Sequence, residues 1–187
     1  IARDHGPEAL LPVHYGGSNG LLTDGAADAL FFRRFGAARA VKNLCAGGSS
    51  AAQRALYGPM AGMALPDLEH SDLIVLWGVN LHVTGIHAVP FVERALERGA
   101  KLIVVDPRAT PFARRAHLHL ALRPGADLPL ALAIARELFA RGLADEAFLA
   151  RHARGVDAFR AACGRWTLER ASEAAGVPAD AIARFAE

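Results

Sequence analysis

Three short segments of the chain carry residue types that bind nucleotides. They read Gly78-Val79-Asn80, Asp106-Pro107-Arg108 and Arg123-Pro124-Gly125-Ala126-Asp127, and each follows directly on an apolar run. A glycine allows close approach of the backbone to a phosphate, and an arginine pairs with a diphosphate. A carboxylate accepts hydrogen bonds from ribose hydroxyls or from the N1 and N2 donors of guanine. Together the three segments are typical of a dinucleotide site.

Each of these groups also has a purely structural explanation. Gly78 and Gly125 can end strands, Asp127 can cap the helix that follows, and Asp106 can pair with Arg108 on the surface. The segment after the first apolar run reads Gly-Val-Asn-Leu-His-Val-Thr-Gly and lacks the G-x-G-x-x-G fingerprint of a nicotinamide-binding Rossmann site. The missing fingerprint makes a dehydrogenase that uses NAD an alternative rather than the first choice. A nucleotide-binding module without catalytic activity is a second alternative.

Cysteine and histidine are the remaining residues with metal or nucleophilic chemistry. Cys45 lies in a loop of small residues, where a thiolate ligates a soft metal or acts as a nucleophile, or where a thiol is a small buried hydrophobe. Cys163 is distant and no C-x-x-C motif is present, which argues against a disulfide framework and a structural zinc site. His117 and His119 alternate on one strand face but have no evident third ligand. His82 follows the first strand, where most histidines are solvated or hydrogen-bonded.

The elements that position these residues follow a strand, helix, strand order. Residues 73–77, 101–105 and 118–122 are short apolar runs, as expected of strands that are buried on both faces of a parallel sheet. Residues 86–98 have helical periodicity and stop at Gly99. Parallel strands present their carboxyl ends to one crevice, where nucleotides bind. We predict an α/β fold: a three-layer Rossmann-like domain with a mostly parallel sheet and a helical C-terminal extension.

The chain reads as one α/β fragment of a longer protein, spanning residues 1–187 and opening on Ile rather than Met. We expect three parts, namely an N-terminal strand, helix and metal-ligand loop (1–65), a dinucleotide-binding core (66–142) and a helical extension (143–187). The N-terminal strand is predicted over 10–15 and the N-terminal helix over 21–36. Helices over 128–141, 145–154 and 167–175 each open on an Asp or Thr cap and close at a glycine.

Composition limits the function classes. The 187 residues are 52% hydrophobic and 21% charged, enough for one sizeable core, and this excludes a disordered chain. No apolar run reaches the roughly 18 to 20 residues of a membrane span. The net charge is only +2 and the basic residues are scattered, so we expect no nucleic-acid partner.

Residues 71–80, 98–108 and 123–127, taken in that order and spacing, resemble the molybdopterin oxidoreductases of the dimethyl sulfoxide reductase superfamily. Two further stretches, Tyr15-Gly16-Gly17-Ser18 upstream and 147–152 downstream, are similar to the corresponding parts of that family. The likeness covers nearly the whole chain. It departs from the family at Leu81, where Pro is frequent, and at Ala126, where Thr is frequent.

The resemblance implies a cofactor in which two molybdopterin guanine dinucleotides chelate one molybdenum or tungsten, with the guanosine diphosphate end of one held by this chain. It implies diphosphate contacts around 78–80, ribose or guanosine contacts at 106–108, a guanine contact at Asp127, and Cys45 as the catalytic thiolate ligand of the metal. The candidate cofactor-binding residues are Trp77, Gly78, Val79, Asn80, Asp106, Pro107, Arg108, Gly125 and Asp127.

The family's chemistry is oxygen-atom transfer or another two-electron redox reaction of a small substrate. We expect a bacterial enzyme with a small-molecule substrate and an electron-transfer subunit, and a 4Fe-4S cluster only in the full-length enzyme. Ala46 stands where formate dehydrogenases place a His, which makes formate a less favoured substrate. The fragment alone should be inactive. We expect the cytoplasm rather than the periplasm, and an export signal, if there is one, would lie outside these residues.

Overall fold

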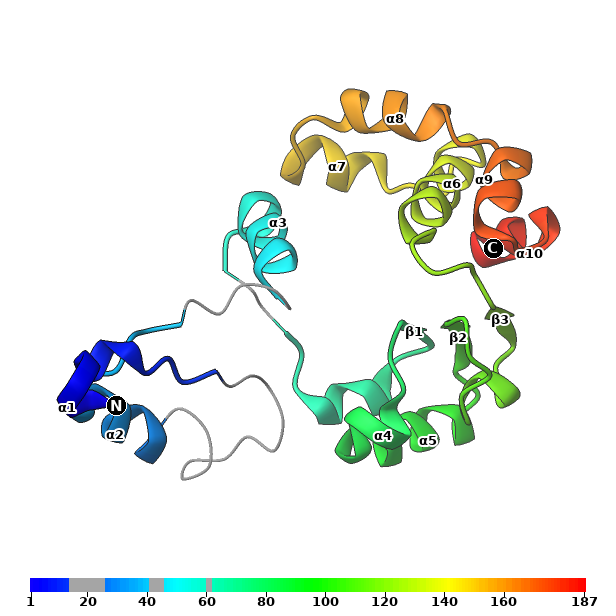
Figure 1. The fold of residues 1–187 in the computed structure, drawn as a ribbon. Helices are drawn as coiled ribbons and strands as arrows, with labels where there is room; N and C mark the ends of the chain where they lie inside the picture. Colours follow the sequence, from blue (N-terminus) through cyan, green and yellow to red (C-terminus); the bar gives the residue numbers. More distant parts are fainter. Residues whose placement is uncertain (14–25, 41–45, 60–61) are drawn as a thin grey trace. The chain divides into compact units, whose positions relative to one another are not determined.

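The computed structural model describes residues 1–13, 26–40, 46–59 and 62–187, and the chain forms two compact units, Ile1–Gly62 and Met63–Glu187 (Figure 1). Within the second unit, α6 (Asp127–Ala140) packs against α8 (Val156–Gly164) and α9 (Leu168–Ala175). Cys45 lies outside the described residues.

The first unit contains short helices in its described part. These are α1 (Ala2–His5), a 3₁₀ turn (Pro7–Ala9), α2 (Ala27–Phe35) and α3 (Gly47–Tyr57). Helix α2 ends at Gly36, whose φ of 83° is the left-handed conformation that glycine adopts at a helix end.

The N-terminal strand predicted over 10–15 is wrong for the residues that the structure describes. Residues 10–13 have no regular secondary structure, and Leu11 and Val13 are exposed. The Leu10 carbonyl accepts one bond from the Ala38 N–H, at 3.0 Å. Pro12 has no N–H to continue a ladder, so the apolar run lacks the pairing that a strand requires. Residues 14 and 15 lie outside the described part.

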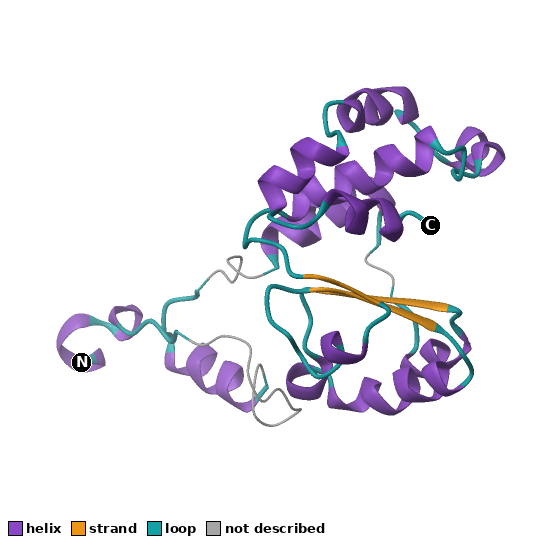
Figure 2. Ribbon diagram, turned by 90° about the vertical axis from the view of Figure 1, so that its right-hand side faces the viewer, coloured by secondary structure: helices purple, strands orange, loops and turns teal. Residues whose placement is uncertain are grey.

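The second unit is built on a three-stranded parallel sheet (Figure 2). Its strands are β1 (Leu73–Trp77), β2 (Lys101–Val105) and β3 (Leu118–Leu120), in the order β1-β2-β3. In the register, Trp77 lies opposite Val105, and Val105 lies opposite Leu120. The prediction of an α/β fold with a parallel sheet is confirmed.

One face of the sheet packs against the crossover between β1 and β2. Helix α5 (Val89–Glu97) carries Val92 and Ala95, both fully buried, against Leu102 and Val104 of β2. This layer also holds α4 (Leu81–Thr84) and three 3₁₀ turns: Leu65–His70, Ile86–Ala88 and Ala113–Arg115.

The opposite face packs against the C-terminal helices. Ile103 and Val105 of β2 point to this side and share a core with Leu130 of α6, Ala171 of α9 and Ile182 of α10 (Ala179–Phe185). Because alternate residues of β2 serve the two faces, the unit has three layers, as predicted. Figure 1 shows α4 and α5 on one side of the strands and α6, α9 and α10 on the other.

The helical extension contains a helix that we did not predict, α8. Helix α7 (Glu146–His152) begins after Asp145, whose carboxylate accepts from the Phe148 N–H at 2.8 Å, and α9 begins after Thr167 in the same manner. Helix α8 lies between them and begins after Gly155, which offers no side-chain cap. No described helix is both long enough and apolar enough to cross a membrane.

Candidate functional site: the C-terminal edge of the sheet

The ends of the three strands lie level at one edge of the sheet. The Gly78 N–H donates to the Val105 carbonyl at 2.8 Å, and the Asp106 N–H donates to the Leu120 carbonyl at 3.2 Å. Both bonds continue the ladder by one residue beyond the strands. The structure therefore brings the segments that begin at Gly78 and Asp106 to one edge, as expected for parallel strands.

The turn after β1 leaves room for a ligand beside its backbone. Gly78 has a φ of +62°, and a Cβ built there would meet no atom within 4 Å. The carbonyl of Asn80, the residue before α4, accepts from the N–H groups of Val83 and Thr84 within that helix (3.0 and 2.9 Å). The backbone of this turn is thus fixed, while the space next to Gly78 stays open.

Two polar side-chain atoms in this turn have no hydrogen-bond partner among the described residues. They are the Asn80 Oδ1 and the His82 Nδ1, and both are buried. The His82 ring lies 4.6 Å from the ring of Phe112, which is itself fully buried. Buried polar atoms in proteins are nearly always hydrogen-bonded, so this turn has unused hydrogen-bonding capacity. Sequence reasoning singled out Asn80 but regarded His82 as solvated or hydrogen-bonded.

The turn after β2 is shaped by Asp106. This side chain is 8% exposed, and its Oδ1 accepts from the Arg108 N–H at 2.7 Å. The Asp106 carbonyl lies 2.9 Å from the His119 Nε2. One carboxylate oxygen of Asp106 is therefore used by the fold itself. Pro107 and Arg108 are exposed, and the Arg108 guanidinium makes no ion pair with any residue in the described part of the chain.

At the third segment, Asp127 is linked to the end of β1. The Trp77 Nε1 donates to the Asp127 Oδ1 at 2.7 Å, across fifty residues of chain. Asp127 is exposed and is the first residue of α6, whose N-cap is Ala126 with no side-chain cap bond. The explanation of Asp127 as a helix cap is therefore wrong, because its carboxylate bonds an indole instead. Gly125, with a φ of +85°, leaves open space where a Cβ would lie.

His117, directly before β3, and His119, within β3, form hydrogen bonds with backbone groups. The His117 Nδ1 accepts from the Leu102 N–H at 3.0 Å, and His119 bonds the Asp106 carbonyl. Within the described ranges, no group of three or more His, Cys, Asp or Glu side chains is placed to hold a metal ion. Burial raises the pKa of the Cys163 thiol on α8, which disfavours its thiolate. The predicted metal ligand, Cys45, lies outside the described residues.

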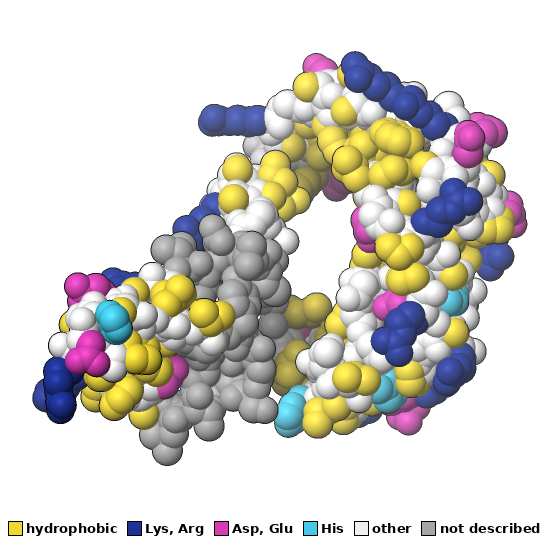
Figure 3. Space-filling view, in the orientation of Figure 1, with side chains coloured by type: hydrophobic (Ala, Val, Ile, Leu, Met, Phe, Trp, Pro, Cys, Tyr) yellow, Lys and Arg dark blue, Asp and Glu magenta, His cyan; other side chains and the backbone are white. Residues whose placement is uncertain are grey.

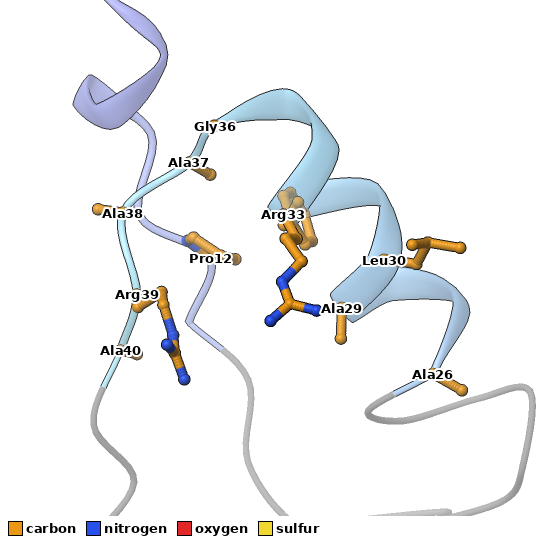
Figure 4. A pocket seen from close by; sticks show the side chains of 11 residues that line it. Pro12, Ala26, Ala29, Leu30, Arg33, Gly36, Ala37, Ala38, Arg39 and Ala40 are labelled. Carbon is orange, nitrogen blue, oxygen red and sulfur yellow. The ribbon is translucent and has the colours of Figure 1, made fainter.

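The first unit has a hollow of its own, of about 560 Å³, between α2 and the coil that follows it (Figure 4). Alanines, Leu30 and Pro12 line it together with the side chains of Arg33 and Arg39. None of the candidate cofactor-binding residues belongs to it. On the face of the molecule drawn in Figure 3, the coloured Lys and Arg side chains are spread singly.

The residues at the strand edge fit one end of a dinucleotide. Open space beside Gly78 and Gly125 admits a phosphate or a sugar, and the exposed Arg108 guanidinium supplies donors for a diphosphate. The exposed carboxylate of Asp127 supplies acceptors for a base. The Asn80 amide supplies hydrogen-bonding capacity that no described residue uses.

Comparison with known proteins identifies the family of the chain. Residues 13–177 match the family described as "Molybdopterin oxidoreductase". The chain is 31% identical over 184 residues to the "Probable oxidoreductase YoaE" of Bacillus subtilis, covering 98% of this chain and 27% of that protein. It is 33% identical over 119 residues to subunit alpha of the F420-dependent formate dehydrogenase 2 of Methanococcus maripaludis, covering 64% of this chain and 18% of that subunit.

A solved structure shows the same likeness in three dimensions. The acetylene hydratase of Pelobacter acetylenicus superposes with a TM-score of 0.74 at 26% identity, over 99% of this chain and 25% of that one. The chain thus spans about a quarter of the length of both YoaE and the acetylene hydratase. The family match over most of the chain confirms the resemblance seen in its sequence: this chain belongs to the molybdopterin oxidoreductase family.

Proposed function

We propose that this chain binds the guanosine diphosphate end of a molybdopterin guanine dinucleotide within a molybdenum or tungsten oxidoreductase. The observation that carries the proposal is the shared strand edge, where an exposed carboxylate at Asp127 and open backbone at Gly78 lie on neighbouring elements joined by one hydrogen bond. Membership in the molybdopterin family supports the choice of cofactor.

Each segment of the edge has a distinct task in this proposal. The Gly78 turn receives the diphosphate through its backbone, and Arg108 neutralises its charge. Asp106 holds the second turn in shape through the Arg108 N–H and so presents that guanidinium to the ligand. Asp127 accepts from the N1 and N2 donors of guanine.

The bound cofactor would supply the two-electron or oxygen-atom-transfer chemistry, because such chemistry belongs to the cofactor rather than to amino-acid side chains. For this chain we propose one direct contribution to the metal, the Cys45 thiolate. That assignment rests on the resemblance alone. A 4Fe-4S cluster is proposed only for the full-length enzyme.

The substrate is proposed to be a small molecule. The relatives named above include a formate dehydrogenase subunit and an acetylene hydratase, so family membership by itself is compatible with several substrates. Because one relative is an alpha subunit, we propose an electron-transfer subunit as partner. We propose the cytoplasm as the location.

The test is a thermal-shift titration of this chain with GDP, ADP and NAD. A ligand at ten times its Kd stabilises the folded state by about 1.4 kcal/mol, so GDP should raise the Tm more than ADP does. Asp127→Asn should weaken the GDP response, whereas Asp157→Asn, which removes the same charge from an exposed position on α8, should not. A response to NAD without one to GDP would favour a dehydrogenase. Equal responses to GDP and ADP that do not depend on Asp127 would favour a general nucleotide-binding module.

A further inference from the structure

We propose that Trp77 is a positioning residue that orients the Asp127 carboxylate for base recognition and thereby sets the preference of the strand edge for guanine. This inference rests on the proposed function. Trp77 itself does not need to touch the nucleotide. Its role is to hold the acceptor atoms of Asp127 in one orientation before the base arrives.

The Trp77–Asp127 hydrogen bond joins two layers of the fold. It runs from the last residue of β1 to the first residue of α6, with a separation of 2.7 Å between Nε1 and Oδ1. A bond of this length to a carboxylate is charge-assisted. Asp127 is exposed, and an exposed Asp side chain without such a bond samples several rotamers. The indole therefore selects one of them.

Trp77 is itself held in place by the core. It is partly buried, and its ring meets Phe185 of α10 edge to face, with 6.1 Å between ring centroids and 67° between planes. Helix α10 is anchored by Ile182, which is fully buried. The direction of the indole N–H is thus fixed by packing rather than by solvent. Packing in the core therefore restrains the indole of Trp77, and the indole in turn restrains the exposed carboxylate of Asp127.

The bond also fixes the hydrogen-bonding role of Asp127. An indole N–H only donates, so it pairs with the carboxylate as an acceptor and occupies one of about four acceptor positions. The remaining positions accept from N–H groups. Guanine presents N1–H and N2–H₂ on one edge, hypoxanthine presents N1–H without the amino group, and adenine presents an acceptor at N1. A pre-oriented carboxylate therefore discriminates GDP from IDP and ADP.

The decisive variant is Trp77→Phe, which keeps an aromatic ring against Phe185 and removes the donor. Trp166→Phe is the matched control, because Trp166 is also partly buried and its ring lies under the Arg170 guanidinium rather than bonded to Asp127. Calorimetric titration with GDP and IDP should show a GDP affinity about 3- to 10-fold weaker in Trp77→Phe, the cost of ordering one free side chain. The ratio of GDP to IDP affinity should fall as well, while Trp166→Phe should keep that ratio.

A double-mutant cycle separates positioning from general damage to the fold. In an Asp127→Ala background, Trp77→Phe should cause no further loss of GDP affinity. A readout without ligand is the indole N–H resonance of Trp77, assigned by its disappearance in Trp77→Phe. Asp127→Ala should move that resonance and leave the Trp166 resonance in place.

The outcomes distinguish this inference from the proposed function. If GDP binds and depends on Asp127 while Trp77→Phe binds GDP and IDP as the wild type does, the positioning role is wrong and the proposed function stands. Additive effects of the two substitutions would also overturn the positioning role. If the wild-type chain binds no GDP, the proposed function fails and this inference fails with it, whatever the resonance shows.

Discussion

Replacing Asp106 with alanine should destabilise the second unit, because this carboxylate holds the turn after β2. Its Oδ1 accepts from the Arg108 N–H at 2.7 Å, and the side chain is only 8% exposed. A hydrogen bond to a charged group contributes about 1.5–3 kcal/mol, so Asp106→Ala should lower the free energy of unfolding by about 2 kcal/mol. Asp106→Asn keeps an acceptor at the same position and should cost less than about 1 kcal/mol.

Urea unfolding followed by tryptophan fluorescence measures this difference. Trp77 and Trp166 both lie in the second unit, so the signal reports on that unit. A loss of about 2 kcal/mol should move the midpoint by roughly 1 M urea. The stabilising role of the Asp106 carboxylate is refuted if the free energy of unfolding of Asp106→Ala lies within about 0.5 kcal/mol of the wild-type value. It is also refuted if Asp106→Asn is as destabilised as Asp106→Ala.

Three further predictions concern the same unit. Gly78→Ala should cost about 1–2 kcal/mol in the same unfolding assay, because its φ is +62° although no atom blocks the Cβ, and an unchanged midpoint would contradict this. The hydrogen bond from Arg94 lowers the pKa of Glu69 below its ordinary value of 4.5, so Glu69 contributes stability above that pH and loses it as the pH falls through the lowered value. Wild type and Glu69→Gln should therefore differ in stability at pH 7 and converge in acid, and a difference that grows in acid would refute the ion pair. Burial raises the pKa of Cys163, so a thiol reagent at pH 7 should leave its peptide unmodified in the folded chain and modify it in urea, as read by mass spectrometry.

The sheet and its functional edge could be predicted because both depend on local patterns. Runs of apolar residues at 73–77 and 101–105 predict strands buried on both faces, and a glycine or an aspartate directly after each run marks the strand end. The prediction of burial on both faces is confirmed for β2 but wrong for β1, where Leu73 and Val75 are exposed. Parallel pairing then places those ends at one edge without any knowledge of side-chain contacts. This reasoning located Gly78 and Asp106 correctly in the fold.

The remaining features depend on contacts between distant residues. The bond between Trp77 and Asp127 is set by how α6 packs on the sheet, fifty residues along the chain, so Asp127 was indistinguishable from a helix cap. Helix α8 begins after a glycine without a polar cap, which removed the usual start signal. The apolar residues at 10–13 have the composition of a strand, but among the described residues they have no strand to pair with.

We propose that this chain belongs to an enzyme that carries a guanine-containing molybdopterin cofactor at the C-terminal edge of its sheet. The most direct measurement is metal analysis of the purified full-length protein, combined with chromatography of the nucleotides released by acid. We expect the purified protein to contain molybdenum or tungsten together with a guanine nucleotide. We expect the Asp127→Ala variant to have lost the guanine nucleotide. A protein purified with neither of these metals and with no guanine nucleotide would contradict it.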